Sequence, residues 1–366
     1  MATIHPSFRV AAVQAAPAFL DLGATIEKTI DLIREASDGG ARLIAFPETW
    51  IPGYPSFVFL GAPAWSMKFI QRYHDNSLVL GSPEYRLIEE AAAKHNITVV
   101  LSYSEKDAGT LYIAQAIIDA SGKTIANRRK LKPTHVERTV FGEGDGSDLS
   151  VHPTELGRLG ALCCWEHLQP LNRYAMFAQN EQIHVGAWPS FSLYRDQAHV
   201  LGHEVNNAVS QVYAVEGQCF FIAPSATTSS EMVALMCETP DQKDLLQTGG
   251  GYARIYGPDG RSIGGNLAPN AEGLVYADID LGLISLSKAT ADPVGHYSRP
   301  DVTRLVIDRS PRSRVHYVNA NGSEFEGRAR YGAIHRQDSC GKVANPDLPI
   351  PAADVAPNES ASTVAS

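Results

Sequence analysis

Short apolar segments typical of buried β-strands alternate with amphipathic helices along most of this 366-residue chain. Residues 8–14 are apolar and include β-branched side chains, which favours a buried strand. In the next segment Ile26, Ile30 and Ile33 share one helical face, and charged residues fill the other. A Gly-Gly pair at 39–40 then ends the helical pattern. This alternation predicts an α/β fold, built as one continuous domain without an internal linker.

The same alternation continues to about residue 280. Strands are predicted at 42–46, 97–103, 158–163, 182–188 and 218–223, and helices at 82–96, 166–179 and 203–216. Two apolar runs, at 111–118 and 124–129, flank a turn-like Asp-Ala-Ser-Gly sequence, which predicts a β-hairpin. Another hairpin is predicted at 252–264, around Gly-Pro-Asp-Gly. Antiparallel pairs of this kind make the predicted sheet mixed.

The pattern fails after about residue 310. We therefore predict one catalytic domain over residues 1–310 and a C-terminal extension over 311–366. The last part of the extension, 343–366, is rich in Pro, Ala, Ser and Asp and has few large apolar residues, so it is expected to be a mobile tail.

Composition excludes several classes of protein. The net charge of −9 argues against a nucleic-acid partner, which normally requires a clustered basic surface. No apolar run approaches the roughly 20 residues that span a bilayer, so no membrane role is expected. The N-terminus lacks the pattern of a secretory signal, and the five cysteines are too few and too scattered for a disulfide scaffold. We expect a cytoplasmic protein with free thiols.

Cys164 is a candidate nucleophile, because it stands where the apolar strand at 158–163 gives way to a helix-compatible segment. Backbone N–H groups at a helix start lower a thiol pKa and stabilise developing negative charge. A purely structural role as a buried small side chain remains open. His167 could instead pair with Cys164 as in other thiol hydrolases. A zinc site with Cys163 is disfavoured, since no further Cys/His pair stands at suitable spacing.

Two further segments carry candidate catalytic groups. Glu48 follows the strand at 42–46, where burial would raise its pKa and suit it to accept a proton, although this segment alone favours an ion-pair or capping role. A basic strand end at 127–132 contains Lys130 and Lys132, either of which could stabilise an anionic intermediate, or simply be solvated. Lys132 precedes a proline, where regular strand pairing ends, so Lys130 is the better-fixed charge.

Together these segments resemble the nitrilase branch of the carbon–nitrogen hydrolase superfamily, in its long microbial form. The resemblance lies in Phe46-Pro-Glu48, in the segment from Arg129-Lys130 to Glu137, and in Cys164-Trp-Glu-His167, which occur in the family's order. It extends from about residue 9 to residue 301, and closes with the segment Ala-Asp-Pro-Val-Gly-His-Tyr-Ser-Arg-Pro-Asp at 291–301.

The resemblance implies a role for each residue. Cys164 becomes the nucleophile, Glu48 the general base, Lys130 the cation that stabilises the tetrahedral intermediate, and Glu137 an auxiliary carboxylate. It also implies an α-β-β-α sandwich, two protomers packed through their helix layers, and further assembly into spiral filaments.

The implied reaction is hydrolysis of a nitrile to an acid and ammonia through a thioimidate and a thioester, with an amide as possible by-product and without a metal or organic cofactor. Amidase relatives usually follow the cysteine with residues other than Trp-Glu-His, which favours nitriles, whereas cyanide-degrading relatives share that signature. A catalytically silent assembly protein is a further alternative. Candidate substrate-binding residues are Tyr54, Trp165, His167 and Trp188, within a wider set of nearby aromatic residues that also includes Trp50, Phe191 and Tyr194.

Overall fold

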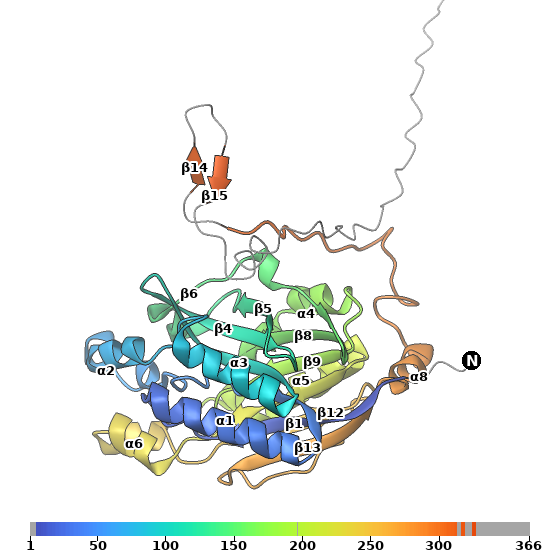
Figure 1. Cartoon of the computed structure of the whole chain (residues 1–366). Coiled ribbons are helices and arrows are strands. Elements are labelled where there is room, and N and C mark those ends of the chain that lie inside the picture. The colour runs from blue at the N-terminus through green and yellow to red at the C-terminus, as the bar shows by residue number, and fades with distance from the viewer. Residues whose placement is uncertain (1–4, 196, 313–315, 319–323, 327–366) are drawn as a thin grey trace, which may run out of the picture.

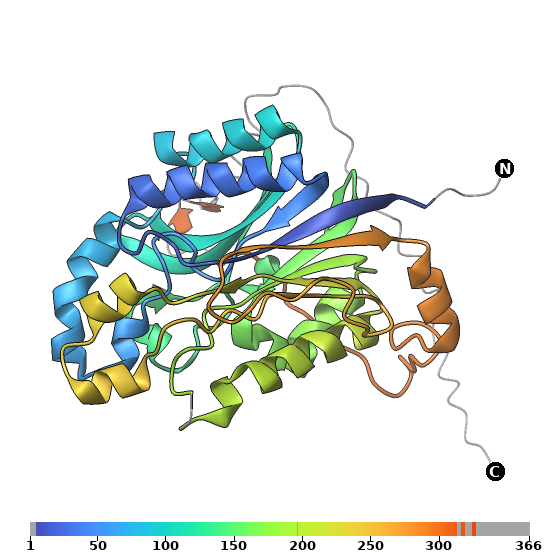
Figure 2. The ribbon, with the colours of Figure 1, turned by 90° about the horizontal axis from the view of Figure 1, so that it is seen from below.

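Two β-sheets pack face to face, and helices cover the outer face of each sheet (Figures 1 and 2). The computed structural model describes residues 5–195, 197–312, 316–318 and 324–326. The four layers are the predicted α-β-β-α sandwich. Within the described residues, none of the helices combines the length and the apolar character that crossing a bilayer requires.

The first sheet has eight strands and is mixed, as predicted. Its central order is β11 (Ser225–Ala226), β1 (Ser7–Ala15), β2 (Ala41–Ala45), β3 (Thr98–Asp107), β4 (Thr110–Ile118) and β5 (Thr124–Arg129), with β13 (Gly273–Asp280) paired to β1 and β6 (Phe141–Gly142) paired to β4. The strands β1, β2 and β3 are parallel, whereas β3, β4 and β5 form an antiparallel meander. As a result β2 and β5 run in the same direction and end at the same edge.

The second sheet has five strands. Their order is β12 (Arg254–Tyr256), β10 (Phe220–Ala223), β9 (Ile183–Ala187), β8 (Gly157–Cys163) and β7 (His152–Thr154). The three central strands are parallel to one another.

The helix layers consist of α1 (Leu22–Asp38) and α3 (Pro83–His95) over the first sheet, and α4 (Pro170–Phe177) and α5 (His203–Gly217) over the second (Figure 2). Their ends follow local chemistry. Asp21 and Ser82 cap the N-termini of α1 and α3 by accepting backbone N–H groups, and Gly40, after α1, adopts a positive φ of 81°. The remaining helices are α2 (Pro63–Asp75), α6 (Ser230–Met236), α7 (Pro240–Leu245) and α8 (Leu283–Thr290), and a short separate hairpin is formed by β14 (His316–Val318) and β15 (Glu324–Glu326).

The core is divided by the two faces of each strand. Along β1, Val10 and Ala12 belong to the apolar cluster between the two sheets, whereas Ala11 and Val13 belong to the cluster under α1 and α3. Because successive side chains of a strand point to opposite faces, one apolar strand supplies both clusters. This double burial explains why β1 has an unbroken apolar run rather than a strict polar–apolar alternation.

Three sequence predictions need correction. The segment 166–179 is not one helix, because Pro170 lacks the N–H that a continuous helix requires; a 3-10 helix (Cys164–Leu168) precedes α4. The hairpin at 252–264 reduces to β12 and an isolated bridge between Tyr256 and Ser262. The helices α2, α6, α7 and α8 were not predicted.

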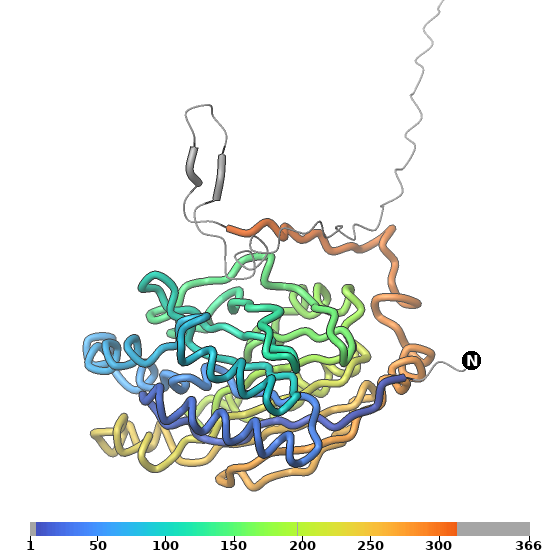
Figure 3. Tube along the Cα trace, in the orientation of Figure 1, coloured from blue at the N-terminus to red at the C-terminus, as the bar shows by residue number. Residues whose placement is uncertain are grey.

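The last described segment of the main body returns to the sandwich, as the trace in Figure 3 shows. The side chains of Leu305 and Ile307 pack against the cluster under α4 and α5, and the backbone N–H of Arg312 donates to Asp145 at 2.8 Å. The predicted tail at 343–366 lies outside the described residues.

Candidate active site

Three candidate catalytic residues follow the ends of three strands. Glu48 stands three residues after β2, Lys130 directly after β5, and Cys164 directly after β8. The two sheets thus bring together groups that are far apart in sequence, at the carboxyl ends of their strands, where sites of α/β proteins gather.

Lys130 occupies the centre of this cluster. Its Nζ lies 2.8 Å from Oε1 of Glu48 and 2.9 Å from Oε2 of Glu137, and its side chain is fully buried. Burial alone would lower the pKa of Lys130, but the carboxylates of Glu137 and Glu48 outweigh burial and raise it well above its ordinary value. Lys130 is therefore a fixed positive charge. Lys132 is exposed and pairs with Glu143 at the surface.

Glu137 is held by the loop that follows β5. Its Oε2 accepts the backbone N–H of Thr134 at 2.6 Å in a capping box, and its Oε1 accepts the hydroxyl of Tyr54 at 2.6 Å. Both carboxylate oxygens are thus engaged, which suits Glu137 to orient Lys130.

Glu48 has one oxygen in use and one free. Oε1 accepts a hydrogen bond from Nζ of Lys130, whereas Oε2 is buried and has no hydrogen-bond partner among the described residues. Burial raises the pKa of Glu48 to about 8, with Lys130 opposing the shift and Glu137 adding to it. A buried carboxyl group with a raised pKa and a free oxygen is an effective proton acceptor in its ionised form.

Cys164 adopts a positive φ of 48° at the start of the 3-10 helix, the sharp strand-to-helix turn expected of a nucleophile. The helix start predicted a lowered pKa for this thiol. The pKa is instead raised well above its ordinary value. Burial is the main cause, Glu48 adds to it, and Lys130 opposes it. The turn is too short to supply a strong helix dipole. The thiol is therefore neutral at rest and needs a base. Cys163 packs in a separate apolar cluster.

We call residues 163–167 the nucleophile turn, after the role predicted for Cys164. Glu166 ties this turn to the end of β5, next to Lys130. Its two oxygens accept the backbone N–H of Cys163 at 2.8 Å and that of Leu131 at 2.9 Å, and both also receive the guanidinium of Arg128. No role was assigned to Glu166 or Arg128 from the sequence, because their pairing depends on how β5 and β8 approach one another in space.

His167 does not contact the thiol of Cys164 through either ring nitrogen. Nδ1 lies 2.6 Å from the carbonyl oxygen of Cys164, and Nε2 lies 2.8 Å from Nε2 of His184. This geometry rules against both a Cys–His pair and a zinc site with Cys163. In the described part of the chain, no cluster of three or more His, Cys, Asp or Glu side chains is arranged to hold a metal ion.

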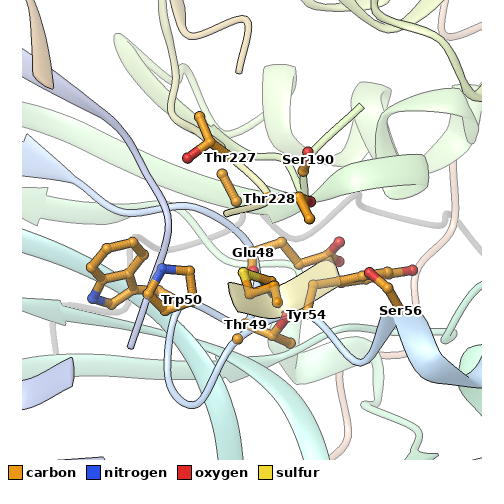
Figure 4. Close-up of a pocket in the computed structure, with 12 residues that line it drawn as sticks. Glu48, Thr49, Trp50, Tyr54, Ser56, Ser190, Thr227 and Thr228 are labelled. Atoms are coloured by element: carbon orange, nitrogen blue, oxygen red, sulfur yellow. Dashed lines mark hydrogen bonds between the residues drawn. The ribbon is translucent and has the colours of Figure 1, made fainter. Parts of the chain in front are cut away.

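A small pocket opens beside Glu48 (Figure 4). Glu48, Thr49 and Tyr54 form one side, and Ser190, Thr227 and Thr228 face them. The remaining lining residues are Pro17, Trp50, Gly53, Ser56, Ala226 and Met232. The sequence gives no signal of this hydroxyl-bearing wall, since it forms only where the segments after β9 and β11 come together.

The predicted aromatic residues divide between the pocket and the core. Tyr54 and Trp50 line the pocket, although the indole N–H of Trp50 points away from it to Thr29. Trp188, predicted to bind substrate, instead donates its indole N–H to Ser210 and does not line this pocket. Its backbone carbonyl accepts the N–H of Glu48 at 3.2 Å, so Trp188 supports the site from behind.

The other aromatic side chains lie around the site without lining this pocket. Trp165 is partly buried against the cluster of α4 and α5, and Phe191 is buried beside Trp188. The hydroxyl of Tyr194 donates to the backbone carbonyl of Phe59 at 2.5 Å.

Comparisons with known proteins identify the family. The carbon-nitrogen hydrolase family model matches residues 9–289. A nitrilase of Pseudomonas syringae pv. syringae is 59% identical over 303 residues, which cover 83% of this chain and 90% of that protein. A nitrilase of Alcaligenes faecalis described as arylacetone-specific is 54% identical and covers 84% of this chain and 87% of its own. The crystal structure of a carbon-nitrogen hydrolase from Helicobacter pylori G27 shares the fold, with a TM-score of 0.65 at 18% identity over 82% of this chain and all of that one.

The match spans the segments that carry Glu48, Lys130 and Cys164, and the structure brings these segments together at one edge of the sandwich. The chain therefore belongs to the carbon–nitrogen hydrolase family and, within it, to the nitrilase branch.

Proposed function

We propose that this protein is a nitrilase that hydrolyses an organic nitrile with two waters to a carboxylic acid and ammonia. The observation that carries the proposal is the free, buried Oε2 of Glu48, next to a fixed lysine and a neutral thiol. The identity of 54–59% to relatives named as nitrilases supports it.

In the first step, Oε2 of Glu48 takes the proton of the Cys164 thiol as sulfur bonds to the nitrile carbon. The proton passes to the nitrile nitrogen, and a thioimidate results. The base is needed because the buried thiol is not ionised at rest.

In the second step, Glu48 takes a proton from a water as its oxygen adds to the thioimidate carbon. Lys130 stabilises the resulting tetrahedral intermediate, since its charge is fixed before the reaction begins. Glu48 passes this proton, and then the proton of the new hydroxyl group, to the nitrogen, so that ammonia leaves as the carbon–nitrogen bond breaks and a thioester remains. A further water then displaces sulfur, which regains its proton, and the acid is released. If the carbon–sulfur bond breaks first, the product is an amide.

Glu137 and Tyr54 have supporting roles in this scheme. Glu137 fixes the position of Lys130, and Tyr54 fixes Glu137 while its ring lines the pocket. In the pocket wall, the hydroxyls of Ser190 and Thr228 are hydrogen-bonded to Ser192, so the hydroxyl of Thr227 is the one proposed to meet a polar substituent of the substrate. Trp165 follows the nucleophile directly and is proposed to border the substrate on the other side.

An amidase of the same family and a cyanide-degrading enzyme are the alternatives. The decisive experiment incubates the full-length protein with aliphatic, aromatic and arylacetonitriles, with the matching amides, and with potassium cyanide. Ammonia, acid and amide are all quantified, and Cys164→Ala serves as the blank. Ammonia from a nitrile, with an acid as the main product, supports the proposal. Turnover of amides alone, or of cyanide alone, overturns it in favour of the corresponding alternative.

We further propose that residues 1–310 act as one catalytic domain in the cytoplasm and that protomers associate through a helix layer. The described cysteines Cys163, Cys164, Cys219 and Cys237 are free, in keeping with a reducing compartment. On the α4 and α5 layer, Leu171, Val212 and Val215 are large apolar residues exposed on one protomer. Light scattering of the full-length protein tests assembly into filaments, by comparing the particle mass with the 39.6 kDa mass of one chain. The same measurement on a protein truncated after residue 310 tests whether residues 311–366 contribute to assembly.

A further inference from the structure

A continuous chain of hydrogen bonds runs from the nucleophile turn into the core between the second sheet and α5. Nδ1 of His167 lies 2.6 Å from the carbonyl oxygen of Cys164, and Nε2 of His167 lies 2.8 Å from Nε2 of His184. Nδ1 of His184 lies 2.7 Å from Oε1 of Glu181, and the hydroxyl of Tyr213 donates to Oε2 of Glu181 at 2.6 Å. His167, His184 and Glu181 are each at most 1% exposed.

The direction of every hydrogen bond in this chain follows from its first acceptor. A carbonyl oxygen only accepts, so Nδ1 of His167 must carry a hydrogen. Burial lowers the pKa of His167 well below its ordinary value, so the ring is neutral and its Nε2 is bare. His184 must then donate from its own Nε2.

The far end of the chain needs one more proton. With Nε2 of His184 protonated, Nδ1 of a neutral His184 is bare, and Oε1 of Glu181 must donate to it. If the proton moves to Nδ1, an ion pair of His184 and Glu181 results. In either case one proton lies between these two residues, and Oε2 of Glu181 remains the acceptor for Tyr213.

We propose that His167, His184 and Glu181 are positioning residues that hold the nucleophile turn through the carbonyl of Cys164, and that this requires one proton shared between Glu181 and His184. When the proton is lost, Glu181 and the bare Nδ1 of His184 repel each other, or both rings change tautomer. A changed tautomer places the bare Nδ1 of His167 against the carbonyl oxygen of Cys164. One hydrogen bond of the chain is broken in each case.

The surroundings of Glu181 support a retained proton. Burial raises its pKa to about 8, and only the hydrogen bond from Tyr213 opposes that shift. No Lys or Arg in the described part of the chain forms an ion pair with Glu181. The charged and titratable groups that act on Glu181, its two histidines and Tyr213 from neighbouring elements are Arg128, Glu166, Arg173 and Cys219.

Two substitutions of Glu181 form a matched pair of variants. In Glu181→Gln, the amide nitrogen donates to His184 and the amide oxygen accepts from Tyr213, so every hydrogen bond is kept without a proton to lose. Glu181→Leu removes both interactions at similar volume. The inference rests on the proposed nucleophile Cys164, but its test requires no nitrile turnover.

The test measures two quantities for the full-length protein and both variants between pH 6 and pH 9.5. One is Tm at a fixed scan rate, and the other is the rate at which iodoacetamide alkylates Cys164, followed by mass spectrometry of its peptide. Glu48 titrates in all three proteins and affects them alike. Comparing the Tm and the alkylation rate of the wild type with those of Glu181→Gln therefore isolates the effect of the proton on Glu181.

At pH 6, wild type and Glu181→Gln should agree, and Glu181→Leu should have a lower Tm and slower alkylation. Above pH 8, the wild-type Tm should fall about 2 °C or more below that of Glu181→Gln, and wild-type alkylation should fall at least about threefold below it.

A ratio that is constant with pH overturns the shared proton, as does a Glu181→Gln variant that resembles Glu181→Leu at pH 6. If the Tm values of wild type and Glu181→Gln diverge above pH 8 while the ratio of their alkylation rates stays at one, these hydrogen bonds stabilise the fold only and the positioning role is wrong. A wild-type Cys164 that never reacts counts against the proposed nucleophile, and the Tm comparison still decides on the proton.

Discussion

Arg128 and Glu166 form a buried, bidentate ion pair that joins the strand before Lys130 to the turn of Cys164. The two guanidinium–carboxylate distances are 2.9 and 2.6 Å, and both side chains are almost completely buried. Burial tends to raise the pKa of Glu166, but the charge and hydrogen bonds of Arg128 and two backbone N–H groups hold it below its ordinary value. Because each residue stands two positions from a candidate catalytic residue, the pair ties the segment of Lys130 to that of Cys164.

Removing Arg128 should therefore be costly. Arg128→Met leaves the Glu166 carboxylate buried without its cation, and we expect a loss of about 3–5 kcal/mol in the free energy of unfolding. The measurement is urea denaturation at pH 7. The control is Arg9→Met, which breaks an equally bidentate pair with Asp278 that is exposed, and which should change stability little. Equal losses in the free energy of unfolding for the two substitutions would show that the buried pair does not stabilise the fold more than the exposed pair does.

The contrast between β1 and Glu166 shows what the sequence can predict. The strand at 7–15 was predicted nearly to its ends from its apolar pattern, and the helix after it from the spacing of its isoleucines and the Gly-Gly stop, whereas its N-terminal cap at Asp21 was not predicted. The break before α4 also has a local signal, because Pro170 cannot continue a helix. The roles predicted for Glu48, Lys130 and Cys164 came from the family resemblance, since each segment alone also has a structural interpretation.

The rest depends on contacts between elements distant in sequence. The hydrogen bonds of Glu166 join two sheets, that between His167 and His184 joins the nucleophile turn to β9, and that between Tyr213 and Glu181 joins α5 to the start of β9. No local pattern specifies such a pairing. The lowered thiol pKa expected for Cys164 was wrong for the same reason, because the carboxylate that opposes ionisation comes from the segment after β2.

The two adjacent cysteines should respond differently to substitution. Cys164→Ala should abolish nitrile turnover, because it removes the attacking sulfur. Cys163→Ala should retain most of it, because Cys163 packs into an apolar cluster and consecutive residues point to opposite sides. Turnover is measured as ammonia release, with far-UV circular dichroism to verify folding. Equal loss in two folded variants would contradict the assignment of Cys164.

Glu48→Gln should lower turnover by at least about 10²–10⁴-fold, the range expected when a general base is removed. In the wild type, the ionised form of Glu48 is the active one, so kcat/KM should rise with pH until about 8. The variant should lack this rise. A fully active Glu48→Gln would return the residue to a structural role.

The same substitution should affect stability in the opposite direction. The pKa of Glu48 is raised in the folded protein, so its stabilising contribution is complete below about pH 4.5 and is lost as pH rises through about 8. The amide of the Glu48→Gln variant has no proton to lose. The Tm of Glu48→Gln minus that of the wild type should therefore grow between pH 6 and pH 9. A difference that shrinks over this range would mean that ionised Glu48 stabilises the fold.

Lys130 and Lys132 provide the sharpest comparison of a catalytic and a surface charge. Lys130 is buried between Glu48 and Glu137, whereas the side chain of Lys132 is 57% exposed. We expect Lys130→Met to lose at least about 10²-fold in kcat, the scale of removing one partner of an oxyanion. Lys132→Met should lose much less.

A misfolded Lys130→Met would mimic this result, so a second quantity is needed that only a nearby charge controls. Lys130 lowers the pKa of Glu48, and removing it should raise that pKa further. The rise of kcat/KM with pH should then move above pH 8 in Lys130→Met and stay in place in Lys132→Met. An unmoved pH profile in a folded Lys130→Met, or a larger loss of activity in Lys132→Met, would reassign the catalytic cation to Lys132 and leave Lys130 as a structural partner of Glu137.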